Sequence, residues 1–437
     1  MKRIFIAGAL LLIVVSAAQA QISSRHTIVY NSSAEQEEGL DIAQYLQAAV
    51  KAATGFDLRI ADDSQRVKGK TITIGRGKPT EDTFDYGIAV KGNSIAITGG
   101  GCWALTKAVR LLQEGLTQGK NLKDIQCQGN IYSEYLFPRQ EGTNLRILDD
   151  NIWQYDDEKN VPDVWKAVGK DCRNSVRYRA LAELTLAYRP DILTLQEYSS
   201  AMDKYLAPEL EKYGYVNCTQ GEDSHWNFTP IFYNKATVKP EESKYVLYTP
   251  KDFSNVGTKS LTAAAFTLNE NGKRFCIINT HLWYKEERTT PGSDMARASQ
   301  LRLCMAIGEQ LLAKYKNDDG SDLPLFMMGD LNSTLHSTGI QQMLDAGYKP
   351  VQDVATVYGD RRCGHHVCSA KEGFSRKTYR KGTSEDFFGA IDHFLVYSHH
   401  TDGKIYGGAE VKVFHRIYSY FTIEFTDHYP NYADIRL

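Results

Sequence analysis

Short apolar runs that end in acidic, amide or histidine residues recur along the last two thirds of this chain. Six segments carry the pattern, at residues 148–151 (LDDN), 195–197 (LQE), 279–282 (NTHL), 329–332 (GDLN), 391–393 (IDH) and 426–428 (TDH). Short apolar runs are typical of buried β-strands, and polar groups are costly to bury without a partner. Their recurrence therefore predicts one shared site at the strand ends of a sheet, built for a divalent metal and a phosphate.

The bulk composition allows a large folded protein and argues against one class of function. The chain has 437 residues, which is longer than one typical domain. Apolar residues make up 42% and charged residues 24%, so a sizeable core is possible. The formal net charge of -2 argues against unspecific nucleic-acid binding, although it leaves room for a locally basic cleft.

The first 20 residues are typical of a secretory signal peptide. Lys2 and Arg3 form a basic start, residues 4–15 are apolar, and residues 18–20 (AQA) form a small-x-small cleavage site. The apolar run is short for a membrane span, so an uncleaved anchor is the less favoured alternative. We expect an exported protein, periplasmic or secreted, with no stable membrane insertion.

The eight cysteines permit disulfides in an exported chain. Cys276 and Cys304 lie in apolar segments, where buried free thiols are expected. Cys363 and Cys368 are five positions apart and flank two histidines. A small disulfide loop is the first interpretation of this pair, and a zinc site is the second.

A small α/β accessory domain is predicted over residues 21–137. Helical spacing runs over residues 40–53, and two short strands within 87–97 flank a glycine-asparagine turn, which indicates a hairpin. Glycines 99–101 then lead into an amphipathic helix through residues 103–112. Such glycines can cradle a phosphate, but without a full nucleotide-binding motif a sharp turn for close packing is favoured.

Residues 86–116, with this hairpin, glycine run and helix, resemble the small domain that precedes the catalytic barrel in several exported glycoside hydrolases. The resemblance implies an accessory or binding role for the first domain. It carries no implication about catalysis.

From residue 144 onward, many apolar strands accompany only a few helices. The predicted helices span 176–187 and 295–313, and the predicted strands are 145–148, 192–195, 231–233, 263–266, 275–278, 325–328 and 391–396. This balance predicts an α+β fold, an α/β sandwich in which two β-sheet layers are flanked by helices. We therefore expect a second domain over 144–437, after a linker that contains Pro138 and Gly142.

Three of the strand-end segments offer groups for metal and phosphate chemistry. Glu197 ends an apolar strand, and a carboxylate at that position suits Mg2+, which prefers oxygen ligands. Asp330 and Asn332 are two apart, so they point the same way if strand geometry persists and can hold a water against a phosphate. His281 could donate to a phosphate oxygen. Taken singly, each is better explained as an ordinary strand end or turn, and only their joint occurrence favours a site.

Two Asp-His dipeptides, Asp392-His393 and Asp427-His428, offer a general base. Neighbouring residues on a strand point to opposite faces, so an Asp does not readily orient the His next to it. A cross pairing is favoured, in which Asp392 orients His428. An oriented histidine is the usual general base.

The ordered set of motifs over residues 144–437 resembles the endonuclease/exonuclease/phosphatase superfamily, the fold of pancreatic deoxyribonuclease I. The resemblance implies a two-layered β-sandwich flanked by helices, with one metal-dependent site at one edge. It also implies that Glu197 is the main metal ligand, that Asn151 contacts metal or phosphate, and that Asp427 is a second metal-side carboxylate. Two aspartates immediately before Asn151 depart from the common motif. They leave open whether an extra carboxylate joins the site.

The same resemblance implies the catalytic roles. Asp330 and Asn332 match the pair that positions the attacking water, and His281 matches the residue that supports the phosphate or leaving group. His428 matches the general base, and Asp392 matches the acid that orients it.

These observations predict an exported Mg2+-dependent phosphoesterase, with Mn2+ or Ca2+ as alternative metals, that cleaves a phosphodiester or phosphomonoester by in-line attack of water. A catalytically inactive binding protein on the same fold is the alternative. A glycan-directed hydrolase, which needs two carboxylates and no metal cluster, is less favoured.

The sequence leaves the substrate open among nucleic acid, a phospholipid headgroup and a sugar phosphate, and it gives no oligomeric state. Residues 361–381 are strongly basic and either bind a polyanion at the cleft rim or form a solubilising loop. Trp153, Trp226 and Trp283 lie near the site motifs and either stack on a base or sugar or pack in the core.

Overall fold

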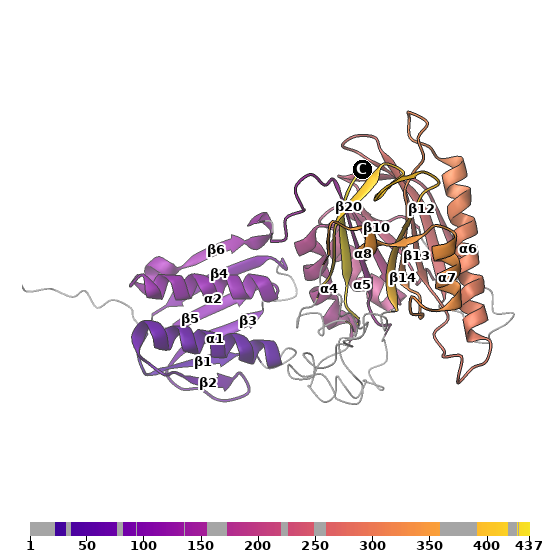
Figure 1. Cartoon of the computed structure of the whole chain (residues 1–437). Coiled ribbons are helices and arrows are strands. Elements are labelled where there is room, and N and C mark those ends of the chain that lie inside the picture. The colour runs from indigo at the N-terminus through magenta and orange to yellow at the C-terminus, as the bar shows by residue number, and fades with distance from the viewer. Residues whose placement is uncertain are drawn as a thin grey trace, which may run out of the picture. The chain divides into compact units, whose positions relative to one another are not determined.

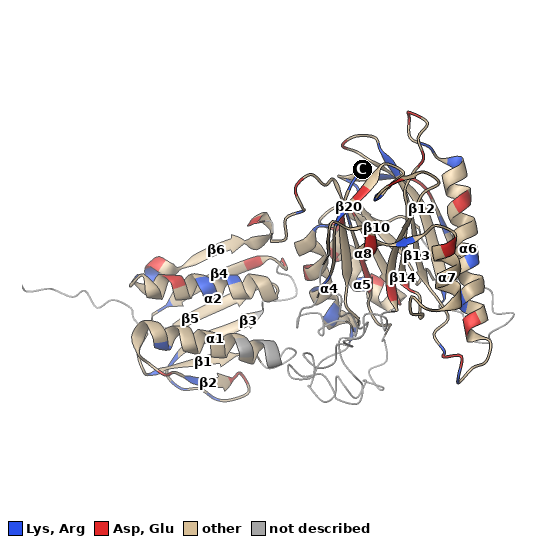
Figure 2. Cartoon of the chain, viewed as in Figure 1, with Lys and Arg blue, Asp and Glu red and all other residues tan. Residues whose placement is uncertain are grey.

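The computed structural model describes residues 22–31, 36–76, 82–92, 94–134, 136–154, 173–219, 226–248, 259–358, 391–417, 426 and 428–437. The chain divides into two compact units, with the boundary between Ile131 and Tyr132 (Figure 1). The predicted signal peptide lies outside the described residues. None of the described helices has the length and hydropathy that crossing a bilayer requires. Charged residues of both signs are interspersed over both units (Figure 2).

Unit 1 is a six-stranded mixed sheet, covered on one face by two helices. Its strand order is β2-β1-β3-β5-β4-β6. The elements are β1 (His26–Tyr30), α1 (Gln36–Thr54), β2 (Arg59–Asp62), β3 (Lys70–Arg76), β4 (Asp85–Lys91), β5 (Ser94–Gly99), α2 (Cys102–Thr117), η1 (Leu122–Ile125), β6 (Cys127–Asn130) and η2 (Ile131–Glu134), the last of which crosses the boundary. One aliphatic core joins both helices to the sheet, because alternate strand residues face the same side.

The glycine run of unit 1 serves close packing, which was the favoured interpretation. A Cβ atom at Gly99 would lie 2.3 Å from the backbone nitrogen of Leu105, and one at Gly100 would lie 1.8 Å from the carbonyl oxygen of Asp82. No larger residue fits at either position. The predicted hairpin is also present, as the antiparallel pair β4 and β5.

Unit 2 is a sandwich of two sheets with helices on its outer faces. One sheet has the order β18-β19-β20-β21-β7-β8-β10-β9, with β16 beside β20, and the other has the order β11-β12-β13-β14-β17-β15. Figure 1 shows α4 (Asn174–Tyr188) and α5 (Ser200–Glu211) beside the first sheet, and α6 (Ser293–Lys314) and α7 (Thr338–Asp345) beside the second. The predicted two-layered, helix-flanked sandwich is therefore the observed fold.

The remaining elements of unit 2 are β7 (Leu145–Asn151), β8 (Ile192–Gln196), β9 (Tyr215–Asn217), β10 (Ile231–Asn234), β11 (Val238–Leu247), β12 (Ser260–Leu268), β13 (Arg274–His281), β14 (Leu325–Asp330), β15 (Lys349–Pro350), α8 (Val351–Val354), β16 (Val357–Tyr358), β17 (Asp392–Tyr397), β18 (Thr401–Asp402), β19 (Ile405–Tyr406), β20 (Ala409–Arg416) and β21 (Asn431–Arg436).

The space between the two sheets changes from apolar to polar along the strands. On β7, Leu145 and Ile147 face the apolar inter-sheet core, and the next residues with the same alternation are Asp149 and Asn151. Burying each aliphatic side chain stabilises the fold by about 1.5–3 kcal/mol. The apolar half therefore holds the sheets together, and the polar half is available for a site.

The segment predicted as a linker packs against unit 2. Arg146 donates from Nη1 to the Phe137 carbonyl at 2.6 Å and from Nη2 to the Pro138 carbonyl at 3.2 Å. Arg139 forms an ion pair with Asp191 at 3.0 Å. The structural boundary accordingly lies before this segment, and the residues around Pro138 belong to the second unit.

Among the described cysteines, Cys127, Cys218, Cys276 and Cys304 are free thiols. Cys276 and Cys304 are fully buried, as the sequence predicted. Burial raises the pKa of Cys276 to about 12 and that of Cys304 to about 11, so both stay protonated and unreactive. The pair at 363 and 368, with its two interpretations, lies outside the described residues.

Candidate active site

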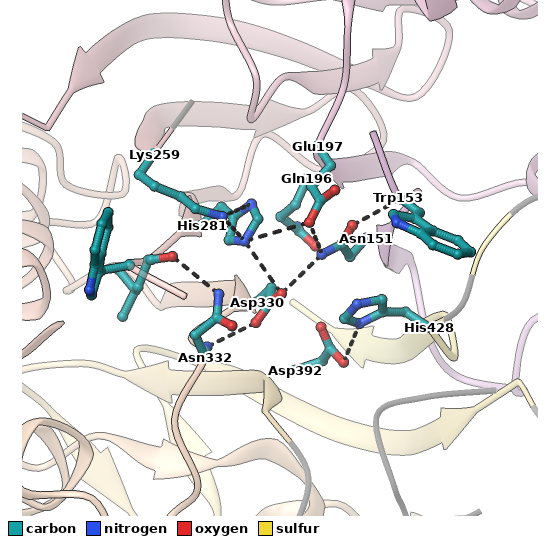
Figure 3. A network of polar contacts seen from close by, with 12 residues as sticks. Asn151, Trp153, Gln196, Glu197, Lys259, His281, Asp330, Asn332, Asp392 and His428 are labelled. Carbon is teal, nitrogen blue, oxygen red and sulfur yellow. Dashed lines mark hydrogen bonds and ion pairs between the residues drawn. The ribbon is translucent and has the colours of Figure 1, made fainter. Parts of the chain in front are cut away.

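Strand pairing brings the polar strand ends to one edge of the sandwich. The parallel pair β7 and β8 sets Asn151 opposite Gln196. The parallel pair β13 and β14 sets His281 opposite Asp330, and antiparallel β17 adds Asp392 beside Asp330. The side chains therefore converge, as Figure 3 shows.

A buried polar layer centred on Gln196 lies beneath these side chains. Gln196 Nε2 donates to Asp149 Oδ1 and to Asn279 Oδ1, each at 2.7 Å. Thr194 Oγ1 also donates to Asp149 Oδ1, at 2.6 Å. Asn279 Nδ2 donates to the Leu195 carbonyl at 2.8 Å. Because β8 and β13 belong to different sheets, these bonds fix one strand end relative to the other.

The two aspartates before Asn151 stay out of the candidate metal cluster. Asp149 takes part in the buried layer, where burial raises the pKa of its carboxyl to about 7 against the opposing hydrogen bonds from Thr194 and Gln196. Asp150 is the next residue along β7 and so projects from the opposite face of the sheet. Among the described residues, neither carboxylate belongs to a group of side chains that could bind a metal.

Asn151 links the two carboxylates of the candidate metal cluster. Its Nδ2 donates to Asp330 Oδ2 at 3.0 Å and to Glu197 Oε1 at 3.3 Å. The second oxygen of Glu197 accepts from the backbone N–H of Gln154 at 2.7 Å. Three segments that are far apart in sequence are therefore held by hydrogen bonds around Glu197 and Asp330 (Figure 3).

Lys259 lies inside the cluster, against His281. Its Nζ is 2.5 Å from His281 Nε2 and 3.2 Å from Nδ1. Burial, Lys259 and His428 together hold the pKa of His281 well below its usual value, so the imidazole is neutral. Its Nε2 lies 3.4 Å from Asp330 Oδ2 and 3.9 Å from Glu197 Oε1. Because the ring is neutral, these two contacts are not ion pairs.

The predicted cross pairing of the two Asp-His segments is present in the geometry. His428 Nδ1 lies 2.9 Å from Asp392 Oδ2, and both side chains are buried. With a carboxylate as acceptor, Nδ1–H is the donor, which leaves the Nε2 lone pair as the basic position. Arg416 Nη2 donates to the Asp392 carbonyl at 2.7 Å and fixes the backbone there.

Asn332 is tied to its neighbours by two hydrogen bonds. Its backbone N–H donates to Asp330 Oδ1 at 2.8 Å, and its Nδ2 donates to the Leu282 carbonyl at 3.1 Å. One amide hydrogen is thus used to hold the segment that follows His281. Asn332 therefore orients Asp330 and this segment in addition to any contact with water.

Backbone strain is concentrated at the site. Three of the four described non-glycine residues with positive φ are Trp153 (55°), Glu197 (58°) and Asn332 (46°). Such conformations cost on the order of 1–3 kcal/mol each and persist where the surroundings enforce them. At Gly329, where φ is 133°, a Cβ atom would lie 2.0 Å from the Thr280 carbonyl oxygen. Glycine is therefore required for β13 and β14 to approach beside Asp330.

The donor groups fit a divalent cation. Glu197, His281 and Asp330 each offer an atom within 4.8 Å of the others, and so do Asp330, Asp392 and His428. Burial and the neighbouring Asp392 raise the pKa of Asp330 against the opposing effects of His428 and Lys259, so its negative charge is costly at this position. A bound dication would compensate it, with Glu197 and Asp330 as oxygen ligands. Asp330, predicted as a water-positioning residue, thus also belongs to the candidate metal set.

The tryptophans have different surroundings. Trp283 is 2% exposed and its indole donates to Ser293 Oγ at 3.0 Å, so core packing is its role and it offers no ring to a ligand. Trp226 is partly buried and donates to the Tyr198 carbonyl at 3.1 Å. Trp153 is partly exposed beside Asn151 (Figure 3). The predicted metal residue Asp427 and the basic segment 361–381 lie outside the described residues.

Comparisons with known proteins identify the family of the second unit. The model of the Endonuclease/Exonuclease/phosphatase family matches residues 164–428. The chain is 28% identical to nocturnin from Rattus norvegicus over 167 residues, which cover 35% of this chain and 35% of that relative.

Two solved structures are similar to about two thirds of this chain. A functionally unknown conserved protein from Enterococcus faecalis is 18% identical, with a TM-score of 0.49, over 67% of this chain and 99% of that one. The mannosyl-6-phosphatase of Bacteroides thetaiotaomicron is 16% identical, with a TM-score of 0.49, over 67% of this chain and 100% of that one.

Proposed function

Because the chain belongs to the endonuclease/exonuclease/phosphatase family of metal-dependent hydrolases, we propose that it hydrolyses a phosphodiester or phosphomonoester with Mg2+ held by Glu197 and Asp330. One observation carries the proposal: Asp330 belongs both to the group with Glu197 and His281 and to the group with Asp392 and His428. A candidate metal position and a candidate base therefore lie on either side of one carboxylate.

The side chains divide the proposed reaction between them. His428, with its Nδ1–H on Asp392, accepts a proton from the attacking water at Nε2. Asp330 and Asn332 align that water in line with the scissile bond. Bound Mg2+ supplies charge stabilisation to the phosphoryl and leaving oxygens. Asp427, which the family resemblance places on the metal side, completes the proposed ligand set with Asn151.

Lys259 and His281 supply the phosphate-facing part of the proposed site. The buried ammonium of Lys259 lies against the neutral imidazole and near Glu197 and Asp330. A positive charge held there stabilises negative charge that develops on phosphoryl oxygens. His281 positions this ammonium and, when the ammonium moves toward substrate, offers its own ring to the same oxygens.

Metal dependence is tested with bis(p-nitrophenyl) phosphate and p-nitrophenyl phosphate. We expect turnover of at least one ester, its loss in EDTA and its return with Mg2+, with Mn2+ and Ca2+ as parallel additions. Calorimetric titration of Mg2+ into metal-free protein gives a readout that does not depend on activity.

Glu197→Gln is the informative variant, and Glu286→Gln, at a side chain that is 71% exposed, is its matched control. We expect Glu197→Gln to weaken metal binding at least about tenfold, while the control binds like wild type. Turnover that persists in EDTA contradicts the proposal. Metal binding without turnover of any ester favours an inactive binding protein instead.

The proposal includes export and leaves three substrate classes open. The substrate is a nucleic acid, a phospholipid headgroup or a sugar phosphate. Export rests on the signal-like first 20 residues, and amino-terminal sequencing of the mature native protein tests it.

A further inference from the structure

An exposed aromatic ring stands beside the proposed phosphate site without a part in the chemistry described so far. Tyr284 is 50% exposed and follows His281 by three positions. Exposing a large ring to water forfeits the stabilisation that its burial would give. The ring of the preceding Trp283 is buried and its centre lies 5.2 Å from that of Tyr284, so Tyr284 packs on Trp283 while half of it stays exposed.

The backbone on both sides of Tyr284 is fixed by α6. Trp283 N–H donates to Gln300 Oε1 at 2.9 Å. Arg297 Nη1 donates to the carbonyl of Trp283 at 3.2 Å and to the carbonyl of Lys285 at 2.6 Å. The ring is therefore presented from a braced segment and not from a loose loop, which lowers the entropy lost when a ligand contacts it.

One ammonium group connects the ring to the site. Lys259 Nζ lies 2.5 Å from His281 Nε2 and also 5.5 Å from the centre of the Tyr284 ring. Lys285 Nζ lies 5.9 Å from the same ring centre. A phosphate held near Lys259 would thus have the tyrosine ring as its neighbour, with two positive charges around it.

We propose that Tyr284 is a specificity-determining residue, which stacks on a planar ring in the group attached to the phosphate, as in a nucleoside phosphate. The inference rests on the proposed function, because the phosphate site supplies the anchor for the rest of the substrate. Stacking of a base on an aromatic side chain contributes about 1–3 kcal/mol and tolerates different bases. Phospholipid headgroups and sugar phosphates carry no planar aromatic ring, so a face-to-face stack on Tyr284 is available only to nucleotide-type esters among the three classes.

The test compares two ligands that differ only in the ring. Adenosine 5′-monophosphate and ribose 5-phosphate share the phosphate and the ribose. Their binding is measured by calorimetry with Mg2+ present, in the full chain carrying His428→Ala so that neither ligand is consumed. We expect adenosine 5′-monophosphate to bind about tenfold more tightly.

Substitutions at Tyr284 then assign the preference to this ring. Tyr284→Ala should bring the two dissociation constants to within about twofold of each other, chiefly by weakening adenosine 5′-monophosphate. Tyr284→Phe, which retains the ring, should keep the preference. Tyr45→Ala, which removes a ring that is 44% exposed in unit 1, is the matched control and should also keep it.

Each other outcome overturns the inference. A protein that binds both ligands equally, or neither, has no ring platform beside a phosphate site. A preference that survives Tyr284→Ala places the platform elsewhere, and equal weakening of both ligands by Tyr284→Ala shows a general structural role. Failure of the proposed function is seen separately, as absence of ester turnover in the wild-type chain.

Discussion

The two ends of the unit 2 sandwich both bury charged side chains, but they surround those charges differently. At the end where β7 begins, Arg146 donates all five of its N–H groups: two to the carboxylate of Asp434 and three to the carbonyls of Phe137, Pro138 and Tyr188. The charge of Arg146 is matched at short range, with Nε 2.6 Å from Asp434 Oδ1. This network therefore has a structural role.

At the end where β7 finishes, several carboxylates of the described residues gather close together. Glu197, Asp330 and Asp392 converge there, while the buried cation Lys259 contacts a neutral histidine. The same strand thus begins beside a charge that is paired within the fold and ends beside a carboxylate cluster that could hold a metal ion. A buried charge that the fold itself matches indicates structure, and one that it leaves unmatched indicates a ligand.

The largest effect is expected at the site end, in catalysis. His428→Ala removes the proposed base and should lower kcat by a factor of about 100–10,000. The free energy of unfolding should change far less, because the polar layer beneath remains intact. Steady-state kinetics and denaturant titration of the same preparation measure the two quantities, and full activity in the variant would contradict the assignment of His428.

The next effect is expected at the opposite end, in stability. Arg146→Met strands the carboxylate of Asp434 in a buried place and should cost about 3–5 kcal/mol of unfolding free energy. Residual folded protein should keep its kcat. Lys239→Met, at a pair 3.7 Å apart whose lysine is 69% exposed, is the control and should cost no more than about 1 kcal/mol. Equal losses of unfolding free energy in the two variants would show that the buried Arg146 network contributes no more to stability than an exposed ion pair.

The smallest effect concerns pH and the layer beneath the site. Burial raises the pKa of Asp149 from 3.8 to about 7, so between these values the folded chain binds a proton that the unfolded chain has released. The contribution of Asp149 to the free energy of unfolding is therefore greatest below about pH 4, and it is lost as the pH rises through 7.

Asp149→Asn removes this titrating group. The loss of unfolding free energy between pH 4 and 8 should therefore be smaller in the variant than in wild type by at least about 1 kcal/mol. Denaturant titrations in EDTA across this range measure it. Asp318→Asn, at a side chain that is 84% exposed, should leave the slope unchanged. A wild-type slope in Asp149→Asn would show that the carboxyl is compensated after all.

The periodicity of the strands explains how much of this site the sequence could predict. Alternation along β7 puts Asn151 on the same face as Leu145 and Ile147, so the apolar pattern already indicates which polar residues face inward. The parallel pair β13 and β14 then brings His281 and Asp330 to the same level. Their convergence follows from the two-layered fold that the motif order implied.

Other parts of the site do not follow from the strand pattern, although the family resemblance implies a substrate-facing residue near Lys259. Lys259 precedes β12 and does not end a strand, and it reaches the site because antiparallel pairing sets Ser260 opposite His281. The positive φ of Glu197 is imposed by its surroundings and not by a propensity of glutamate. The bridging role of Gln196 depends on the distance between two sheets, which one sequence cannot give.

The position of β7 between β8 and β21 has a consequence for how the second unit forms. β7 is the first strand of this unit along the chain and β21 is the last, yet they are direct partners, with Asp149 opposite Asn431. During synthesis the apolar edge of β7 has no β21 to pair with until nearly the whole unit has left the ribosome. Pairing over such a sequence separation slows folding and exposes an aggregation-prone edge meanwhile. Activity should accordingly appear late and all at once, when the final strand closes the sheet.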